Sequence, residues 1–235
     1  MRIGILEKNW RNNYMKLNVK ELLDFFDNKK DDIRHDISSV IGVVGEDLGA
    51  ALFKRYYEEA FGKKVSISPF PVLSGTMKGP RLDRWIYIEQ SKNKFTAFQT
   101  EIKNWSAYAI GARRVGTDLK AIPAIGLLNL KDRITRLQHK DKNGESKVFF
   151  PMKKPIDFPS KATLEPLIIY WFVLSKEGKN LDPFFKVNMP IKGFKKLNVF
   201  SMSNYLRSIK KKEITLDMPS AEKRIKLLEK YFPIK

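Results

Sequence analysis

Residues 81–105, RLDRWIYIEQSKNKFTAFQTEIKNW, decide the fold, because they contain two runs in which the side chains alternate between two faces. Alternation with a period of two is the pattern of a β-strand. In the first run, RLDRWIYIE, Asp83 lies on a face with aromatic residues. In the second run, KFTAFQTEIKNW, Glu101 and Lys103 share a face and are spaced about 6–7 Å apart, as alternate residues of a strand are. The stretch therefore predicts two strands that carry ionisable side chains.

Segments on both sides of this stretch predict helices and further strands. Residues 37–61 have the pattern of one long helix, with Ser38 or Ser39 as its N-cap and Gly62 at its end. Ser106 is expected to cap a second helix. Three other segments predict strands: residues 65–72, 164–174 and 197–202. The order of elements indicates an α/β fold with a mixed central sheet flanked by helices.

We expect one folded domain with an appendage at each end. The 235 residues, of which 43% are hydrophobic, are enough to bury a sizeable core. Residues 1–36 predict an N-terminal helical arm, residues 37–210 the α/β core, and residues 211–235 a C-terminal helix packed on the same domain. In that last helix, Ile225, Leu227 and Leu228 are expected to point inward.

The composition limits the chemistry that the protein can perform. Lys and Arg number 45 against 26 Asp and Glu, so the formal net charge is +19, which indicates a polyanionic partner and favours nucleic acid. The chain has no cysteine, which excludes thiolate metal sites, iron–sulfur clusters and cysteine nucleophiles. Only two histidines are present, which disfavours a metal site built on two or three histidines and a Ser-His-Asp triad. Catalysis is therefore expected to use carboxylates and lysines.

No segment has the pattern of a secretory signal or of a membrane span, since the longest apolar run is about half as long as a span requires. We therefore expect a cytoplasmic protein without a membrane partner, associated with the nucleoid if the source is prokaryotic. The phosphate-binding pattern GxxxxGK(S/T) does not occur, so no nucleotide cofactor is expected.

Four ionisable residues form the candidate site. Glu101 and Lys103 belong to one of five acid-x-Lys triplets, and of these five only theirs lies at the end of a strong strand pattern. Asp83 lies one strand upstream. Glu46 falls on the stripe of the long helix that contains Gly49, so it projects from the buried side, whereas Asp47 is expected on another side of the helix. The helix dipole alone also favours an acid at position 46. Burying such groups is costly unless they pair or bind a metal.

A carboxylate on a helix, then a strand with an acid and a strand ending in Glu-x-Lys, resembles the PD-(D/E)XK, or restriction-endonuclease-like, nuclease superfamily. The resemblance covers roughly residues 38–175 and implies the αβββαβ core of that family. It makes Asp83 and Glu101 the two acids of the motif and Lys103 its lysine. Glu46 corresponds to the helix glutamate found in many members.

This sequence departs from the family pattern at two points. Leu82, and not proline, precedes Asp83. The helix expected after Lys103 lacks the Gln-x-x-x-Tyr pattern that is usual in the λ-exonuclease and helicase-linked branch. The second departure disfavours a processive exonuclease.

The resemblance also implies the cofactor and the DNA contacts. Mg²⁺ or Mn²⁺ would be held by oxygen atoms of Asp83, Glu101, Glu46 and, through its carbonyl, Ile102. Lys103 would position or deprotonate the attacking water and stabilise the charge of the transition state. Gln99, on the same strand face, is a candidate contact for a phosphate or for that water. The other candidate contacts to DNA, which are equally consistent with solvent-exposed residues, are Ser106, Arg113, Arg114, Lys210, Lys211 and Lys212.

The function that this set of residues predicts is a metal-dependent endodeoxyribonuclease. A homodimer is expected, because cutting both strands of DNA requires two sites related by a two-fold axis. Two alternatives stay open: a non-cleaving nucleic-acid-binding module of the same fold that serves a repair, transposition or restriction complex, and an RNA-processing nuclease. Structural explanations also stay open, with Glu101 and Lys103 as a solvated charge pair and Asp83 paired with Arg81 or Arg84. The sequence does not specify the structure of the DNA substrate.

Overall fold

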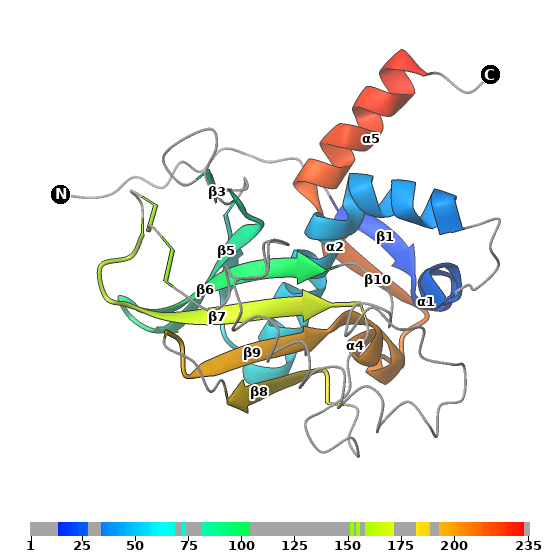
Figure 1. Ribbon diagram of the computed structural model, residues 1–235. Coiled ribbons are helices and arrows are strands. Elements are labelled where there is room, and N and C mark those ends of the chain that lie inside the picture. The colour runs from blue at the N-terminus through cyan, green and yellow to red at the C-terminus, as the bar shows by residue number, and fades with distance from the viewer. Residues whose placement is uncertain are drawn as a thin grey trace.

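The computed structural model of the chain centres on a six-stranded β-sheet (Figure 1). In order across the sheet, the strands are β2 (Val65–Ile67), β5 (Arg84–Ser91), β6 (Lys94–Lys103), β7 (Ala162–Tyr170), β9 (Lys196–Ser201) and β8 (Phe184–Asn188). The structure describes residues 14–27, 34–68, 72–73, 81–103, 151–152, 154–155, 158–171, 182–188 and 193–232.

The sheet is mixed. β5 is antiparallel to both of its neighbours, β2 and β6. β7 is parallel to β6, and β9 is parallel to β7. β8 is antiparallel to β9. The second half of β7, residues 166–170, is buried throughout, as expected for a parallel strand in the middle of a sheet. The predicted α/β class with a mixed sheet is therefore confirmed.

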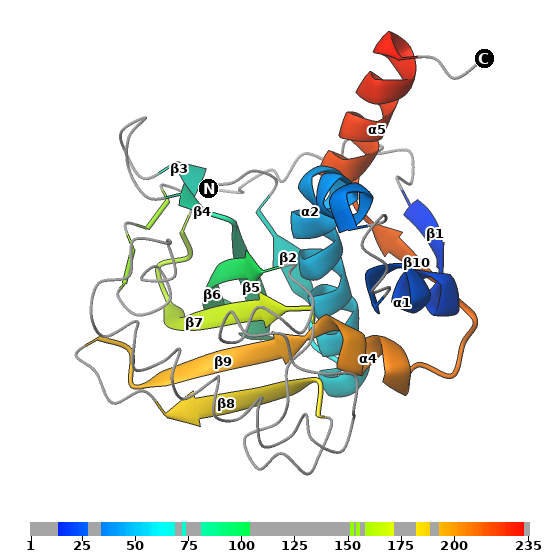
Figure 2. The same cartoon turned by 45° about the vertical axis from the view of Figure 1, so that its right-hand side comes forward.

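The helix α2, Arg34–Phe61, crosses one face of this sheet (Figures 1 and 2). The ring of Phe53, which has no exposed surface, contacts the rings of Phe98, Phe184 and Phe200 on three strands. The long helix that the sequence predicts is confirmed, but it begins before the serines expected to cap it. No helix in the described part of the chain has both the length and the apolar composition needed to cross a lipid bilayer.

A short helix, α4 (Met202–Ser208), follows β9 directly. The side chain of Ser201 caps it by accepting the main-chain N–H of Asn204. The hydroxyl of Tyr205 donates a hydrogen bond to Glu59 on α2 over 2.6 Å, which joins the two helices.

The strand predicted at residues 81–89 is interrupted at Asp83. β4, Arg81–Leu82, pairs with β3, Val72–Leu73, in a separate two-stranded sheet, and β5 begins only at Arg84. The short strand predicted upstream is likewise divided, between β2 and β3. Asp83 lies at a bend between β4 and β5. The alternation of side chains along a strand therefore does not determine its direction.

The N-terminal arm, which was expected to be helical, contains a strand. β1, Tyr14–Asn18, pairs antiparallel with β10, Glu213–Asp217, and is followed by α1, Val19–Asp27. Asn18 caps α1 by accepting two main-chain N–H groups of its first turn. The prediction of an arm that is helical throughout is wrong, because β1 has its partner near the other end of the chain and local periodicity carries no trace of that pairing.

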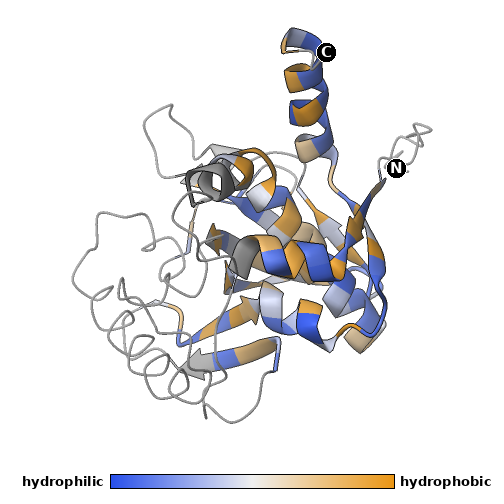
Figure 3. Ribbon diagram, turned by 90° about the vertical axis from the view of Figure 1, so that its right-hand side faces the viewer, coloured by the Kyte–Doolittle hydropathy of each residue, from blue (hydrophilic) through white to orange (hydrophobic). Residues whose placement is uncertain are grey.

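The C-terminal helix α5, Pro219–Tyr231, contacts the body of the protein at its beginning and then projects away from it (Figures 1 and 3). Ala221, in its first turn, is fully buried. Leu227 and Leu228 are 45% and 46% exposed, so the expectation that they point inward is wrong. The predicted boundary at residue 211 also changes, because β10 belongs to the body and only the helix extends beyond it.

Gly49 lies where α2 comes closest to the sheet. A Cβ atom at this position would be 2.8 Å from Cγ2 of Ile102, closer than two carbon atoms normally approach. We expect Gly49→Ala to lower the free energy of unfolding by about 1–2 kcal/mol, since overpacking exceeds the gain of about 1 kcal/mol in helix propensity. Gly42→Ala on the same helix, with nothing within 4 Å, should raise it by about 1 kcal/mol. Urea denaturation measures both, and a stabilised Gly49→Ala would contradict the close packing.

Candidate functional site

Asp83 and Glu101 lie on neighbouring segments of the chain, with Asp83 directly before β5 and Glu101 near the end of β6. The register of β5 and β6 pairs Arg84 with Thr100, so that one acid directly precedes this pair and the other directly follows it. Oδ2 of Asp83 accepts the main-chain N–H of Ile102, next to Glu101, over 2.7 Å. Asp83 is half-buried, and Glu101 is only 2% exposed. The structure therefore places the backbone positions of these two predicted acids side by side.

The two faces of β6 have different surroundings. Ile102 points to α2, because its Cγ2 limits the space at Gly49. Alternation along the strand then directs Glu101 and Gln99 to the opposite face. Gln99 has no exposed surface, and its Oε1 accepts the main-chain N–H of Met152 over 2.8 Å. This hydrogen bond joins the segment around Met152 to β6.

Lys103 is the last residue of β6, and its side chain lies outside the part of the chain that the structure describes. The same applies to Ser106, Arg113 and Arg114. The three lysines predicted to contact DNA after α4 are described, and all three are exposed: Lys210, Lys211 and Lys212.

Glu46, on α2, lies on the face of the sheet that α2 covers, whereas Glu101 is directed to the opposite face. Oε2 of Glu46 forms an ion pair with Nη1 of Arg84 at 3.0 Å. Glu46 stays a predicted metal ligand, and in this structure its carboxylate is paired with Arg84. Among the residues that the structure describes, no group of three or more Asp, Glu and His side chains is arranged to hold a metal ion. The predicted ligands on adjacent segments of the chain are Asp83, Glu101 and the carbonyl of Ile102.

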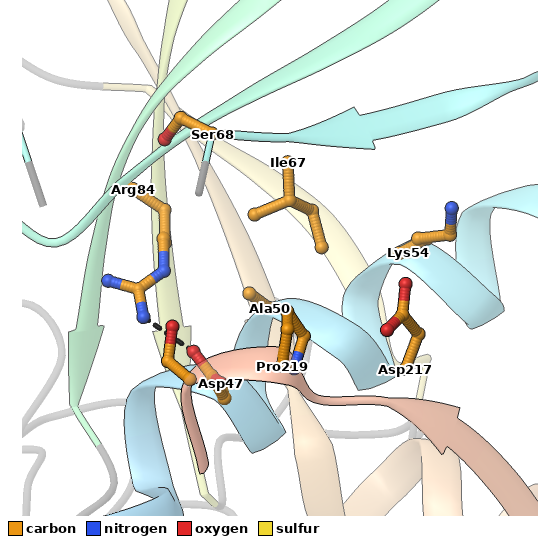
Figure 4. Close-up of a pocket in the computed structure, with 9 residues that line it drawn as sticks. Asp47, Ala50, Lys54, Ile67, Ser68, Arg84, Asp217 and Pro219 are labelled. Atoms are coloured by element: carbon orange, nitrogen blue, oxygen red, sulfur yellow. Dashed lines mark hydrogen bonds and ion pairs between the residues drawn. The ribbon is translucent and has the colours of Figure 1, made fainter. Parts of the chain in front are cut away.

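Arg84 is the centre of a buried ion network that the sequence analysis missed. Its side chain is 2% exposed, and Nη2 contacts Oδ1 of Asp47 at 2.5 Å (Figure 4). Asp47 was expected on a different side of α2 from Glu46, yet it is the more deeply buried of the two, at 5% exposed. Its Oδ2 accepts the main-chain N–H of Ala221 in α5 over 2.7 Å. The available signal was an arginine on the apolar face of a strand, which requires buried acids as partners.

A cavity of about 140 Å³ adjoins this network, between α2, β2 and the junction of β10 with α5 (Figure 4). Its lining includes the charged side chains of Asp47, Lys54, Arg84 and Asp217. Burial raises the pKa of Asp217 above its ordinary value. Lys54 lowers this pKa, while the negative charges of Asp47 and Glu222 raise it further.

This raised pKa predicts a pH dependence of stability. A carboxyl group whose pKa is higher in the folded than in the unfolded protein binds more protons when folded, at pH values between the two. The free energy of unfolding therefore falls as the pH rises from about 4, the ordinary value, through the raised value. We expect Asp217→Asn to be more stable than the wild type at pH 7 and to lose this slope. Thermal unfolding at a series of pH values measures it, and an unchanged slope would contradict the assignment.

The candidate site thus consists of two acids on adjacent segments of the chain, with Lys103 one strand period beyond Glu101. The site lies next to Arg84, which pairs with Glu46 and Asp47 of α2. Asp47 in turn accepts a hydrogen bond from α5. No protein-family model, curated protein or solved structure was found to match this chain.

Proposed function

We propose that the protein is a metal-dependent endodeoxyribonuclease of the PD-(D/E)XK type, which hydrolyses DNA phosphodiester bonds at Asp83 and Glu101. The observation that carries this proposal is the hydrogen bond from the Ile102 N–H to the carboxylate of Asp83. It holds one acid beside the strand residue that carries the other, as an active site with two acids requires.

The topology supports the same proposal. Along the chain, α2 is followed by the antiparallel strands β2, β5 and β6, and β7 then lies parallel to β6. This order of described elements is compatible with the αβββαβ core that the resemblance implies. The helix expected between β6 and β7 falls in residues 104–150, outside the described part of the chain.

The donor set is compatible with Mg²⁺ or Mn²⁺. Both ions prefer oxygen ligands, and Mg²⁺ is commonly bound by one or two carboxylates with several waters. Asp83, Glu101 and the carbonyl of Ile102 would hold it, and the family resemblance adds Glu46. When bound, such an ion supplies positive charge that stabilises the attacked phosphate.

The residues of the chain supply the remaining steps. The N–H of Ile102 fixes the orientation of the Asp83 carboxylate, and the burial of Glu101 lowers the local dielectric constant, so that its interactions with charge are stronger than in water. Lys103, two residues after Glu101 on β6, would orient or deprotonate the attacking water and stabilise the oxyanion.

The net charge of +19 supports a polyanionic substrate, and the exposed lysines that precede β10 are candidate phosphate contacts. We further propose that the protein acts as a homodimer, with two active sites related by a two-fold axis. A cytoplasmic location is part of the same proposal.

A cleavage panel tests this function. Linear duplex, four-way junction, flap and single-stranded DNA are incubated with the purified protein in Mg²⁺, in Mn²⁺ and in EDTA. We expect cleavage of at least one substrate that requires the metal and is lost in Asp83→Ala and Lys103→Ala. Equal cleavage by the wild type and both variants would contradict the proposal. Matched RNA competitors separate a DNA nuclease from an RNA-processing one.

The ion pair of Glu46, the third predicted acid, with Arg84 favours one alternative, a non-cleaving DNA-binding subunit of the same fold. Calorimetry with Mn²⁺ separates the two functions. Metal binding in the wild type that is lost in Asp83→Ala supports the nuclease. DNA affinity without any metal binding supports the binding subunit.

A further inference from the structure

The position of Asp83 is held from two directions. Its carboxylate accepts the N–H of Ile102 on β6, as described above. Its main-chain carbonyl accepts a hydrogen bond from Nη1 of Arg84 over 2.6 Å. The guanidinium of Arg84 thus folds back onto the residue before it, at the bend between β4 and β5. The hydrogen bond fixes the backbone from which the acid projects.

Arg84 is itself fixed by acids on α2. The same Nη1 forms the ion pair with Glu46, and Nη2 forms the one with Asp47. Because a guanidinium is planar and rigid, three bonds in different directions leave it one position. A lysine has a single nitrogen at that distance and cannot reach all three acceptors from one place.

Asp47 extends the chain of hydrogen bonds to α5. One of its oxygens accepts from Arg84 and the other from the N–H of Ala221, which lies 174 residues further along the sequence. The N–H groups at the beginning of a helix are unpaired within the helix and carry partial positive charge, so a carboxylate is favoured there. Only a side chain with two acceptor oxygens can serve both partners.

We propose that Arg84 is a positioning residue for the catalytic Asp83, and that Asp47 and the first turn of α5 keep Arg84 in its place. This inference rests on the proposed nuclease function. Arg84 is buried and its guanidinium pairs with acids of α2, so we assign it no direct contact with metal or DNA. Its loss should therefore weaken metal use and turnover and leave DNA binding unaltered.

Arg84→Lys tests the proposal, because it keeps the positive charge beside Asp47 and removes the fixed geometry. We expect kcat to fall by about 10–100-fold and the Mg²⁺ concentration for half-maximal cleavage to rise by a similar factor, as for other residues that orient metal ligands. The Kd for DNA in EDTA and the KM for DNA should stay within about twofold. A purely structural role would leave the Mg²⁺ dependence of the folded variant unchanged.

Asp47→Asn is the second variant. Asparagine is isosteric but has one acceptor oxygen, so it must give up either Arg84 or Ala221. We expect the same rise in the Mg²⁺ requirement, smaller than in Arg84→Lys. The control is Arg55→Lys, an arginine on the same helix that pairs with Glu59 at 2.5 Å. This control should retain the kcat and the Mg²⁺ dependence of the wild type.

All proteins are assayed well below their unfolding midpoints, with circular dichroism to confirm folding. If the wild type cleaves and Arg84→Lys and Asp47→Asn show unaltered kcat and Mg²⁺ dependence, the positioning role is overturned and the nuclease function stands. If Arg84→Lys does not fold, Asp47→Asn alone decides. If the wild type shows no metal-dependent cleavage, the proposed function and the role of Arg84 are overturned together.

Discussion

Glu101→Gln is expected to lower kcat for Mg²⁺-dependent DNA cleavage by about 10³-fold. A metal ion contributes several kcal/mol of charge stabilisation in the transition state, and about 1.4 kcal/mol corresponds to each tenfold in rate. Glutamine keeps the size of the side chain and loses the charge, so it is a poor ligand for Mg²⁺. Cleavage of a fluorescent duplex at saturating DNA, over a range of Mg²⁺ concentrations, measures the effect.

Stability provides the second measurement on this variant. Glu101 is only 2% exposed, and a buried carboxylate costs desolvation energy that glutamine avoids. If Glu101 serves catalysis, the unfolding midpoint of Glu101→Gln should equal or exceed that of the wild type. If instead its role is a structural charge pair, the variant should lose stability and keep its activity. Glu89→Gln, further along β5, is the matched control and should leave cleavage unchanged.

Arg84→Met is expected to lower the free energy of unfolding by about 3–5 kcal/mol, the largest stability effect that we predict. Methionine leaves Asp47 buried without its cationic partner, and removing one member of a buried ion pair has this cost. Urea denaturation measures it. Arg55→Met is the control, because Arg55 and Glu59 are 22% and 49% exposed. The control should cost about 1 kcal/mol or less.

The double variant Arg84→Met with Asp47→Leu separates the cost of an unpaired acid from the loss of packing. Replacing both partners of a buried pair by apolar residues is commonly much less harmful than replacing one. We therefore expect the double variant to be more stable than Arg84→Met alone, although Ala221 then loses its acceptor. If the loss of unfolding free energy in the double variant equals the sum of the losses in Arg84→Met and Asp47→Leu, the two side chains do not interact.

The main features of the sheet and of the two acids could be predicted from the sequence. Alternation in residues 81–105 is a local property, and it placed two strands next to each other with Asp83 near the start of one and Glu101 near the end of the other. The long helix before them follows from local periodicity in the same way. The net charge needs no structure at all, and it already favoured a polyanionic partner.

The faces of α2 could not be predicted in this way. A single apolar stripe predicts a helix that is buried on one side. α2 instead contacts the sheet on one side and the start of α5 on another. Asp47 lies on the side that α5 covers, so it is buried although it lies off the predicted apolar stripe. The same stripe predicted that Glu46 points toward the two acids. In the structure, Glu46 is paired with Arg84.

The amino-acid order was therefore sufficient for the alternation of the two long strands, the long helix, the charge and the acids of the proposed active site, because each depends on composition or on neighbours along the chain. The pairing of β1 with β10, the exposed end of α5 and the chain of hydrogen bonds from Ala221 through Asp47 and Arg84 to Asp83 emerged only in three dimensions. These contacts join groups up to about 200 residues apart, and long-range contacts form only where the whole fold brings their partners together.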